Sequence, residues 1–310
     1  MSQEIRFTYP SADRITDIQA MMWIPDGKIR GILQISHGML EFVERYGEFA
    51  RFLNRHGILT VGNDHLGHGG SVRSEAYYGY FAEKNGNKIL LSDMRELQRM
   101  TQEKYPDLPY FLFGHSMGSL CARVYTTHFG YELSGVVYCG TAELPAVAEA
   151  ALPVVQSLCE KFGAKTDVTA LGDVFNTICN LSVREKNTLP VAWISRNRQN
   201  QESYLSDPLC GFPLKLGGYR DLFALAVECG RREWATLVPE NLPIMIISGA
   251  KDPVGFNGRG TLSVADNLVL AGHEPTVILY PGDRHEILFE DDHEIVYNDV
   301  LAWLHSIYLS

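Results

Sequence analysis

The stretch Gly114–Gly118 constrains this chain more than any other part of its sequence. It reads G-x-S-x-G, follows the apolar run of residues 110–113 and precedes a helical pattern over residues 119–125. A serine placed this way is typical of a nucleophile elbow, a turn so tight that the serine adopts a strained backbone conformation. The strand before it and the helix after it favour this interpretation over an ordinary turn serine. The pattern predicts an alternating strand–helix fold with a nucleophile at Ser116.

Eight short apolar or β-prone runs predict the strands of one sheet. The first two read as an antiparallel hairpin, and helical patterns at residues 45–56, 88–104 and 292–308 alternate with the others. Near-continuous apolar strands that alternate with helices indicate a mostly parallel sheet covered on both faces. The predicted class is therefore α/β, with strands at residues 5–9, 18–23, 31–36, 58–63, 110–113, 135–139, 243–248 and 276–280.

The alternation stops after Gly140 and resumes near residue 240. The residues between hold helical stretches at 144–162 (interrupted by Pro153), 168–181 and 219–234. The sequence predicts a core of residues 1–140 and 240–310 with a helical cap, residues 141–239, inserted between them. Two consecutive domains are less favoured, because two strands and two helices at the end are too few to fold alone. The first cap helix has one apolar face, made of Leu144, Val147, Leu152, Val154, Val155 and Leu158. This face either lines an acyl-chain site or packs on the core, and both interpretations stay open.

The composition narrows the class of function. The chain has 310 residues, 45% of them hydrophobic, and a net charge of −10 without a cluster of lysine and arginine, so nucleic-acid binding is not expected. Six scattered cysteines contain no C-x-x-C pair, which argues against a zinc site and for reduced thiols. The N-terminus lacks a basic segment followed by an apolar core, and no run approaches 18 apolar residues. We expect a cytoplasmic protein.

Two residues downstream of the serine fit the remaining catalytic roles. A serine hydroxyl needs a base within hydrogen-bond reach, and the base needs a carboxylate that orients it. Asp252 lies in the loop after the seventh predicted strand, and His285 lies in the loop after the eighth. Adjacent loops at the carboxyl edge of a sheet can bring both groups to Ser116. Asp283 is the alternative acid, but it is two residues from His285 and would struggle to reach the far ring nitrogen.

The intermediate of acyl transfer also needs two backbone N–H donors, an oxyanion hole. One donor is the N–H of Met117, the residue after the nucleophile. The other is the N–H of Met39, which lies in the loop after the third strand. In that loop His37 follows the strand directly, which favours a loop-shaping role over a catalytic base. His65 and His68 lie three residues apart in a glycine-rich stretch, where a tight loop is favoured over a metal site. No metal or cofactor is expected.

Several motifs occur together, in order, over nearly the whole predicted core. They are His37-Gly38-x-x-Glu41 with Arg45-Tyr46, Asp64-x-x-Gly67-His68-Gly69-x-Ser71, Gly114-His115-Ser116-Met117-Gly118, Asp252-Pro253, His285 and, in the cap, Ser206-Asp207-Pro208-Leu209. Together they resemble the monoacylglycerol lipase and lysophospholipase group of α/β-hydrolases, which is sometimes grouped with serine aminopeptidases of the S33 type. The resemblance implies an α/β-hydrolase fold and a cofactor-free serine esterase or lipase for monoacylglycerols, lysophospholipids or medium-chain esters. The family usually has glycine at position 40 and histidine at 42, where this chain has Leu40 and Phe42.

Other functions share the same machinery. A small-ester carboxylesterase would differ only in acyl length, and a lyase or perhydrolase only in its products. A peptidase of the proline-iminopeptidase type would need acidic cap groups facing a substrate amine, for which Glu143, Glu149 and Glu202 are candidates. A non-catalytic receptor usually lacks one member of the serine–histidine–acid set, and all three are present here. The cap could also touch a membrane surface transiently, although its acidic residues dilute the apolar face.

Overall fold

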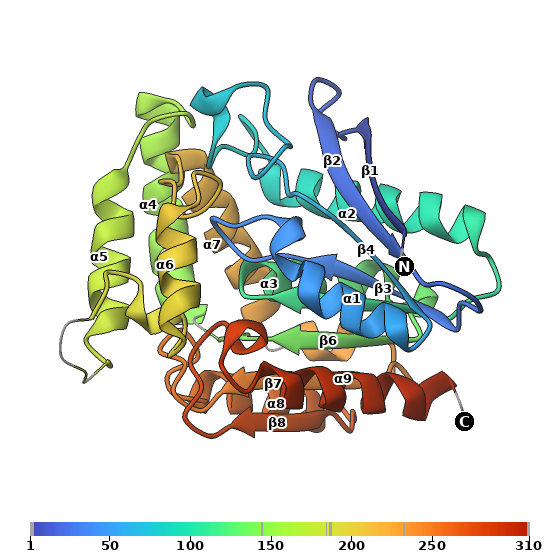
Figure 1. The fold of residues 1–310 in the computed structure, drawn as a ribbon. Helices are drawn as coiled ribbons and strands as arrows, with labels where there is room; N and C mark the ends of the chain where they lie inside the picture. The colour runs from blue at the N-terminus through green and yellow to red at the C-terminus, as the bar shows by residue number, and fades with distance from the viewer. Residues whose placement is uncertain (1–2, 144, 184, 186–187, 232, 309–310) are drawn as a thin grey trace.

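The structure, a computed structural model, describes residues 3–143, 145–183, 185, 188–231 and 233–308 (Figure 1). Eight strands form one sheet in the order β1-β2-β4-β3-β5-β6-β7-β8. β2 runs antiparallel to both β1 and β4, and the remaining neighbours are parallel. The prediction of a mostly parallel eight-stranded sheet is confirmed, with these bounds: β1 (Gln3–Pro10), β2 (Asp17–Ile24), β3 (Gly31–Ser36), β4 (Ile58–Asn63), β5 (Tyr110–His115), β6 (Gly135–Cys139), β7 (Ile244–Gly249) and β8 (Thr276–Tyr280).

Helices cover both faces of this sheet, as Figure 1 shows. Neighbouring residues of a strand serve opposite faces, because side chains alternate along it: Ile32 packs in one core cluster and Leu33 in the other. Every residue of β3 to β7 is buried, which explains why these strands are continuous apolar runs rather than alternating ones. One face carries α1 (Gly47–Arg55) and α9 (His293–Tyr308), and the other carries α2 (Gly86–Lys104), α3 (Met117–Phe129) and α8 (Arg259–Leu270).

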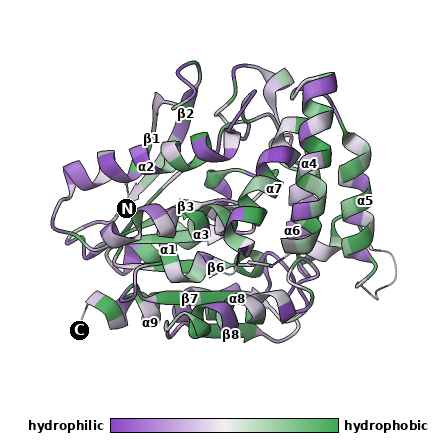
Figure 2. Ribbon diagram, turned by 180° about the vertical axis from the view of Figure 1, so that it is seen from behind, coloured by the Kyte–Doolittle hydropathy of each residue, from purple (hydrophilic) through white to green (hydrophobic). Residues whose placement is uncertain are grey.

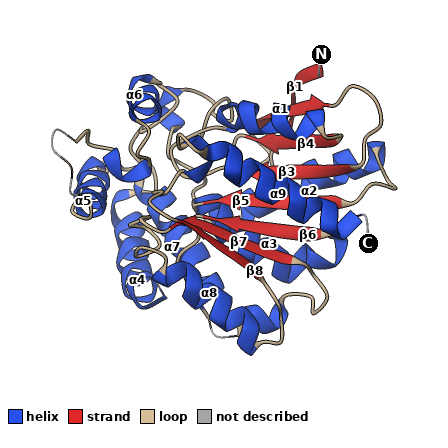
Figure 3. Ribbon diagram, turned by 60° about the horizontal axis from the view of Figure 1, so that its bottom comes forward, coloured by secondary structure: helices blue, strands red, loops and turns tan. Residues whose placement is uncertain are grey.

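The segment between β6 and β7 is helical and lies beyond the carboxyl ends of the parallel strands (Figure 3). Its helices are α4 (Pro145–Phe162), α5 (Thr169–Asn180), α6 (Arg198–Ser206) and α7 (Leu216–Gly230). The predicted interruption at Pro153 is wrong, because α4 continues through that residue. Short 3₁₀ helices complete the described elements: η1 (Val43–Tyr46), η2 (Glu75–Tyr77), η3 (Gly130–Glu132), η4 (Ala192–Ile194), η5 (Trp234–Leu237) and η6 (Ile287–Phe289).

The apolar residues of α4 divide between two directions. Val155 is buried in the same core cluster as residues of α7, whereas Val147 and Val154 are 58% and 59% exposed and Leu158 is 37% exposed. For these three residues the predicted inward face is wrong, because they point to solvent. Leu144 lies outside the described residues. None of the described helices is long and apolar enough to span a bilayer.

Candidate active site

The turn between β5 and α3 holds Ser116 in a conformation that L-residues rarely adopt, with φ 53° and ψ −119°. Both flanking glycines are required by space. A Cβ atom on Gly114 would lie 2.3 Å from the carbonyl oxygen of Gly118, and one on Gly118 would lie 2.0 Å from the carbonyl oxygen of Ser36. The backbone of the turn is fixed on one side by the Ser116 N–H, which donates to the Cys139 carbonyl at 2.9 Å. The strained turn therefore presents the serine side chain at the end of the sheet.

Three side chains predicted from the sequence meet at this turn. His285 Nε2 lies 2.8 Å from Ser116 Oγ, and His285 Nδ1 lies 2.9 Å from Asp252 Oδ2. The carboxylate is itself oriented by the Val254 N–H, which donates to Oδ1 at 2.9 Å. The alternative acid, Asp283, is paired instead with Arg196. The geometry thus joins hydroxyl, imidazole and carboxylate in one hydrogen-bonded chain, as nucleophilic catalysis requires.

The environment of His285 favours its protonated form. Burial lowers its pKa, but the charge of Asp252 and the hydrogen bond to it outweigh burial, with further contributions from the charges of Glu286 and Glu41. The net result is a pKa above the ordinary histidine value. An imidazole in this state accepts a proton readily and remains stabilised by Asp252 once charged.

The loop after β3 lies against the serine turn. A Cβ atom on Gly38 would lie 3.2 Å from Ser116 Cβ. His37 Nε2 accepts a hydrogen bond from the His65 N–H at 2.8 Å, so its Nδ1 carries the proton and donates to the Gly38 carbonyl at 2.7 Å. Because a trans peptide directs its C=O and N–H oppositely, the N–H of Met39 points away from His37. Met117 is the first residue of α3, so its N–H lies at the helix N-terminus, where no intrahelical acceptor exists.

Buried charges hold the same loop from its other side. Glu41 Oε1 accepts from the Gly38 N–H at 2.6 Å and from the Tyr46 hydroxyl at 2.7 Å. Arg45 donates to Glu41 Oε2 at 2.6 Å and forms a bidentate pair with Glu286 at 2.8 and 2.9 Å. Burial raises the pKa of Glu286, but the charge and hydrogen bonds of Arg45 outweigh burial. The pKa therefore lies below the ordinary glutamate value, and this carboxyl remains ionised. Arg45 therefore connects the loop after β3 with the residue next to His285.

The same network extends into the inserted helices. The Asn200 side chain of α6 accepts from Arg45 at 3.1 Å and donates to Glu286 at 2.7 Å. The carbonyl of Leu40 accepts from the Tyr204 hydroxyl at 3.1 Å and from the Gly211 N–H at 3.0 Å. Leu40 itself has φ 61°, a left-handed conformation that glycine adopts without cost. Contacts from α6 and from Gly211, which follows it, thus hold a strained residue in the loop beside Ser116.

Sequence reasoning missed this network and one aromatic contact. Arg45 belongs to a recognised motif, but nothing in the sequence pairs it with Glu286, 241 residues away. Glu286 is adjacent to His285, which is the signal that could have drawn attention to it. The indole of Trp193, from the inserted segment, lies 5.3 Å from the His285 ring and donates to the Asn176 side chain at 2.9 Å.

The two histidines weighed as metal ligands are buried beside His37. The pKa of His65 is lowered to about 3 and the pKa of His68 to about 4, mainly because both rings are buried. Both rings are therefore neutral. The His37 and His65 rings lie 4.3 Å apart, and His65 Nε2 lies 3.0 Å from the Ser36 hydroxyl. Over the part of the chain that the structure describes, no group of three or more potential ligands is arranged to hold a metal ion. These rings pack under the loop that carries Met39.

The sheet has the strand order of the α/β-hydrolases. It also has their nucleophile turn, because a strained serine between β5 and α3 contacts a histidine from the loop after the last strand. Within that class the chain belongs to the family described as serine aminopeptidase S33, whose sequence profile matches residues 27–292. The resemblance that the motifs indicated is confirmed at the level of the family.

Three known proteins illustrate the similarity. A monoacylglycerol lipase of Mycolicibacterium smegmatis is 26% identical over 288 residues, which cover 92% of this chain and 91% of the relative. A thermostable carboxyl esterase from Bacillus coagulans, solved in complex with glycerol, is 32% identical with a TM-score of 0.92, covering 98% of this chain and 99% of the esterase. A lipase solved in an open form is 25% identical with a TM-score of 0.90 and 99% coverage of both chains. The similarity extends over the inserted helices as well as the sheet.

Proposed function

We propose that this protein is a serine esterase that hydrolyses carboxylic esters of the monoacylglycerol type through an acyl-enzyme. The observation that carries the proposal is the hydrogen-bonded chain from Ser116 through His285 to Asp252 at a strained strand–helix turn. The relatives support the substrate class, since they are a monoacylglycerol lipase, a carboxyl esterase and a lipase. The protein is thus a carboxylic ester hydrolase that acts on small-molecule esters.

In the first half of the proposed reaction, Ser116 Oγ attacks the ester carbonyl while its proton passes to His285 Nε2. Asp252 keeps the imidazole in the required tautomer and stabilises its protonated form. The carbonyl oxygen becomes an oxyanion, which the N–H groups of Met39 and Met117 bind. When the intermediate collapses, the ester C–O bond breaks and His285 returns the proton to the leaving alcohol.

In the second half, water takes the place of the alcohol. His285 removes a proton from the water as it attacks the acyl-enzyme carbonyl, and the same two N–H groups bind the second oxyanion. Collapse releases the carboxylic acid, and the proton on His285 returns to Ser116. Each donor of an oxyanion hole typically contributes about 10²–10³ in rate. The contacts of His37 with the Gly38 carbonyl and of Glu41 with the Gly38 N–H fix the two peptides of Gly38 before the substrate arrives, which is the condition for such a contribution.

The acidic residues considered for a peptidase do not form an amine site. Glu143 accepts from Arg123, Ser263 and Asn267. Glu149 is exposed on α4, and Glu202 is exposed and paired with Arg198. Because no observation places an unpaired carboxylate of this set beside Ser116, we propose no second function.

Hydrolysis of p-nitrophenyl esters with acyl chains from two to sixteen carbons tests the proposal, followed by release of glycerol from 1-monoacylglycerols. We expect maximal turnover at medium or long chains, loss of all turnover in Ser116→Ala and unchanged turnover in Ser92→Ala, whose serine is exposed on α2. A maximum at two to four carbons would shift the assignment to small esters. Absence of ester turnover by the wild type would overturn it.

The proposed cap, residues 141–239, also offers a surface to lipid. Each of α4 and α5 carries large apolar side chains exposed to solvent, and Figure 2 shows hydrophobic colour on both helices. A lipase acts on substrates that reside in membranes, so we propose that these faces contact a lipid surface transiently. The exposed residues are Val147, Val154, Leu158 and Phe162 on α4, and Leu171, Val174 and Ile178 on α5, with Leu181 directly after it.

Co-sedimentation with phosphatidylcholine vesicles tests this contact. The triple variant Val154→Ser, Leu158→Ser, Ile178→Ser should sediment less than the wild type. A matched triple of exposed apolar residues outside the cap, Val269→Ser, Leu270→Ser and Ile295→Ser, should sediment like the wild type. Equal loss in both variants would contradict the assignment to the cap.

We further propose that the protein works in the cytoplasm. All six cysteines are free and buried, a state that a reducing compartment preserves. Fractionation of the source cells with an antibody to the protein tests this, and recovery from the extracellular or periplasmic fraction would contradict it.

A further inference from the structure

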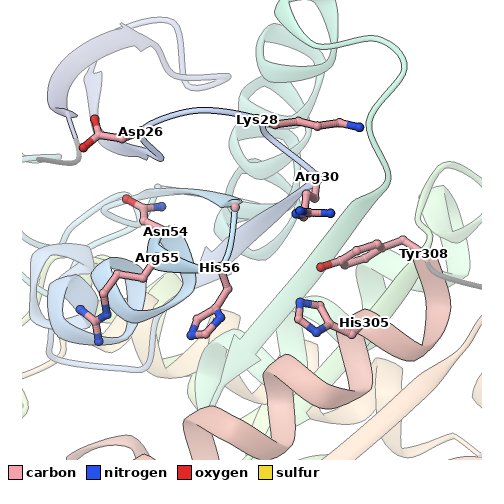
Figure 4. Close-up of a pocket in the computed structure, with 9 residues that line it drawn as sticks. Asp26, Lys28, Arg30, Asn54, Arg55, His56, His305 and Tyr308 are labelled. Atoms are coloured by element: carbon pink, nitrogen blue, oxygen red, sulfur yellow. The ribbon is translucent and has the colours of Figure 1, made fainter.

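A second hollow lies at the opposite end of the sheet from Ser116. It is bordered by Arg30, which directly precedes β3, whereas the loop beside Ser116 follows the other end of the same strand. Six residues of strand separate the two places by about 17–20 Å. The hollow has a volume of about 430 Å³, within the range of small-molecule sites (Figure 4). It is therefore separate from the candidate active site.

The lining of this hollow is basic in a chain of net charge −10. Lys28, Arg30, Arg55, His56 and His305 all border it, from the β2–β3 loop, the end of α1 and the end of α9, with one acid, Asp26. Neither Arg30 nor Arg55 forms an ion pair with a carboxylate of the described residues, in contrast to Arg45, which is fully paired. Positive charge is therefore left available where three elements converge.

Two polar groups that border the hollow are also unsatisfied. Within the described chain, the Tyr308 hydroxyl is buried without a hydrogen-bond partner, and Figure 4 shows it directed toward the space beside Arg30 and His305. The Asn54 side chain is only 5% exposed, and its Oδ1 likewise has no hydrogen-bond partner in the described chain. Its Nδ2 donates to the carbonyls of Trp23 and Ile58, which fixes the orientation of the amide. Of the two, the Tyr308 hydroxyl is the unsatisfied donor that faces the basic side of the hollow.

Helix ends explain only part of this arrangement. Basic residues at the carboxyl end of a helix interact favourably with its dipole, which accounts for Arg55, His56 and His305. Arg30 lies on the loop before β3, so no helix dipole accounts for its position. Burial lowers the pKa of His305, and the charges of His56 and Arg30 lower it further, so these groups repel one another in the absence of an anion.

We propose that this hollow binds a phosphate group, either free phosphate or a phosphomonoester. The guanidinium of Arg30 suits two phosphate oxygens at once, and protonated His305 and the Tyr308 hydroxyl donate to others. The remaining volume accommodates the organic part of a small monoester. This site is independent of the proposed esterase function.

Proton NMR of the histidine Cε1–H signals tests the proposal, with the His305 signal assigned from His305→Gln. Inorganic phosphate, compared with chloride at equal ionic strength, should raise the pKa of His305, because a bound anion favours the charged imidazole. The apparent Kd should rise at least tenfold in Arg30→Met and stay unchanged in Arg231→Met, an exposed arginine at the end of α7. Far-UV circular dichroism and the midpoint of thermal unfolding, unchanged in both variants, show that they are folded.

Phenyl phosphate, titrated in the same way, distinguishes the two sources of the phosphate group. Binding at least tenfold tighter than inorganic phosphate identifies a phosphomonoester site, and equal binding identifies a site for free phosphate. The proposal is overturned if neither probe moves the His305 titration, or if Arg30→Met and Arg231→Met weaken binding equally. Neither result bears on whether Ser116 cleaves esters.

Discussion

The inserted helices meet the sheet in two different ways. The inner cap segment, residues 191–211, is joined to the loop of His285 by buried polar contacts. Glu290 alone accepts from the Ser195 hydroxyl and from the backbone N–H groups of Arg196, Asn197 and Arg284, and the Glu286 N–H donates to the Ile194 carbonyl at 2.6 Å. The outer cap helices, α4 and α5, instead present apolar side chains to solvent.

The difference between polar contacts in the inner cap segment and exposed apolar side chains on the outer cap helices fits the separate roles proposed for the two regions. The proposed catalytic groups lie on loops at one edge of the sheet, and loops are less constrained than the strands they join. Hydrogen bonds are directional, so polar contacts from the inner cap segment can fix the orientation of those loops. Apolar contact is non-directional, so the outer helices can face a changing surrounding without disturbing the geometry at Ser116. The predictions below test this division.

The largest effect is expected from Arg45→Met. The substitution leaves Glu41 and Glu286 buried without their shared cation, and loss of one partner from a buried pair typically costs about 3–5 kcal/mol. We expect that loss in the free energy of unfolding, and a fall in kcat of about 10²–10³ because Glu41, which holds the Gly38 N–H next to Met39, loses its own support. Urea unfolding and ester hydrolysis measure the two quantities.

The matched control for this variant is Arg99→Met. Arg99 also bridges two glutamates, Glu96 and Glu103, but on the exposed face of α2. We expect little change in stability or turnover, because water replaces an exposed ion pair. A similar loss in both variants would show that the buried network has no special role in holding the active-site loops.

The inner cap segment is also where sequence reasoning failed. The strands, the serine turn and the loops of Asp252 and His285 could be predicted, since apolar runs and local motifs determine them. The α6 helix could not, because residues 198–206 carry no apolar periodicity and its start depends on Asn197, whose side chain accepts from the N–H groups of Gln199 and Asn200. Contacts such as Arg45 with Glu286 depend on tertiary structure, to which a single sequence gives no direct access.

The next effect concerns pH. In the proposed mechanism the active form of His285 is neutral, so kcat/KM should be high above the pKa of His285. It should fall as the pH decreases through that pKa, which lies above the ordinary histidine value. Glu286→Gln removes a negative charge that raises this pKa, so the acid limb of the profile should move to lower pH. Profiles of kcat/KM from pH 5 to 9 measure the shift.

Glu202→Gln is the control for the pH profile. It removes an exposed acid of α6 that pairs with Arg198, on the same helix as Asn200. Its acid limb should coincide with that of the wild type. An acid limb that does not move in Glu286→Gln, or that moves upward, would disconnect the buried network from His285.

A smaller effect is expected from Leu40→Gly. Glycine relieves the left-handed strain at φ 61°, a gain of about 1 kcal/mol or more, but it also increases the entropy of the unfolded chain by about 0.5–1 kcal/mol. The free energy of unfolding should therefore change by less than about 1 kcal/mol. Activity should persist, because the Leu40 carbonyl still accepts from Tyr204 and Gly211. Thermal unfolding and ester hydrolysis test this, and a loss of activity above tenfold would mean that the leucine side chain itself contacts the substrate.

The smallest effect is expected in the outer cap. The triple variant Val154→Ser, Leu158→Ser, Ile178→Ser changes side chains that are 59%, 37% and 60% exposed and that make no polar contact with the active-site loops. Exposed substitutions usually change stability by no more than about 0.5 kcal/mol. With a water-soluble short-chain ester, we expect kcat and KM within about twofold of the wild type, while turnover of vesicle-bound monoacylglycerol falls. A loss of kcat on the soluble ester would show that the outer helices also act on the geometry at Ser116, and the division between the two parts of the cap would no longer hold.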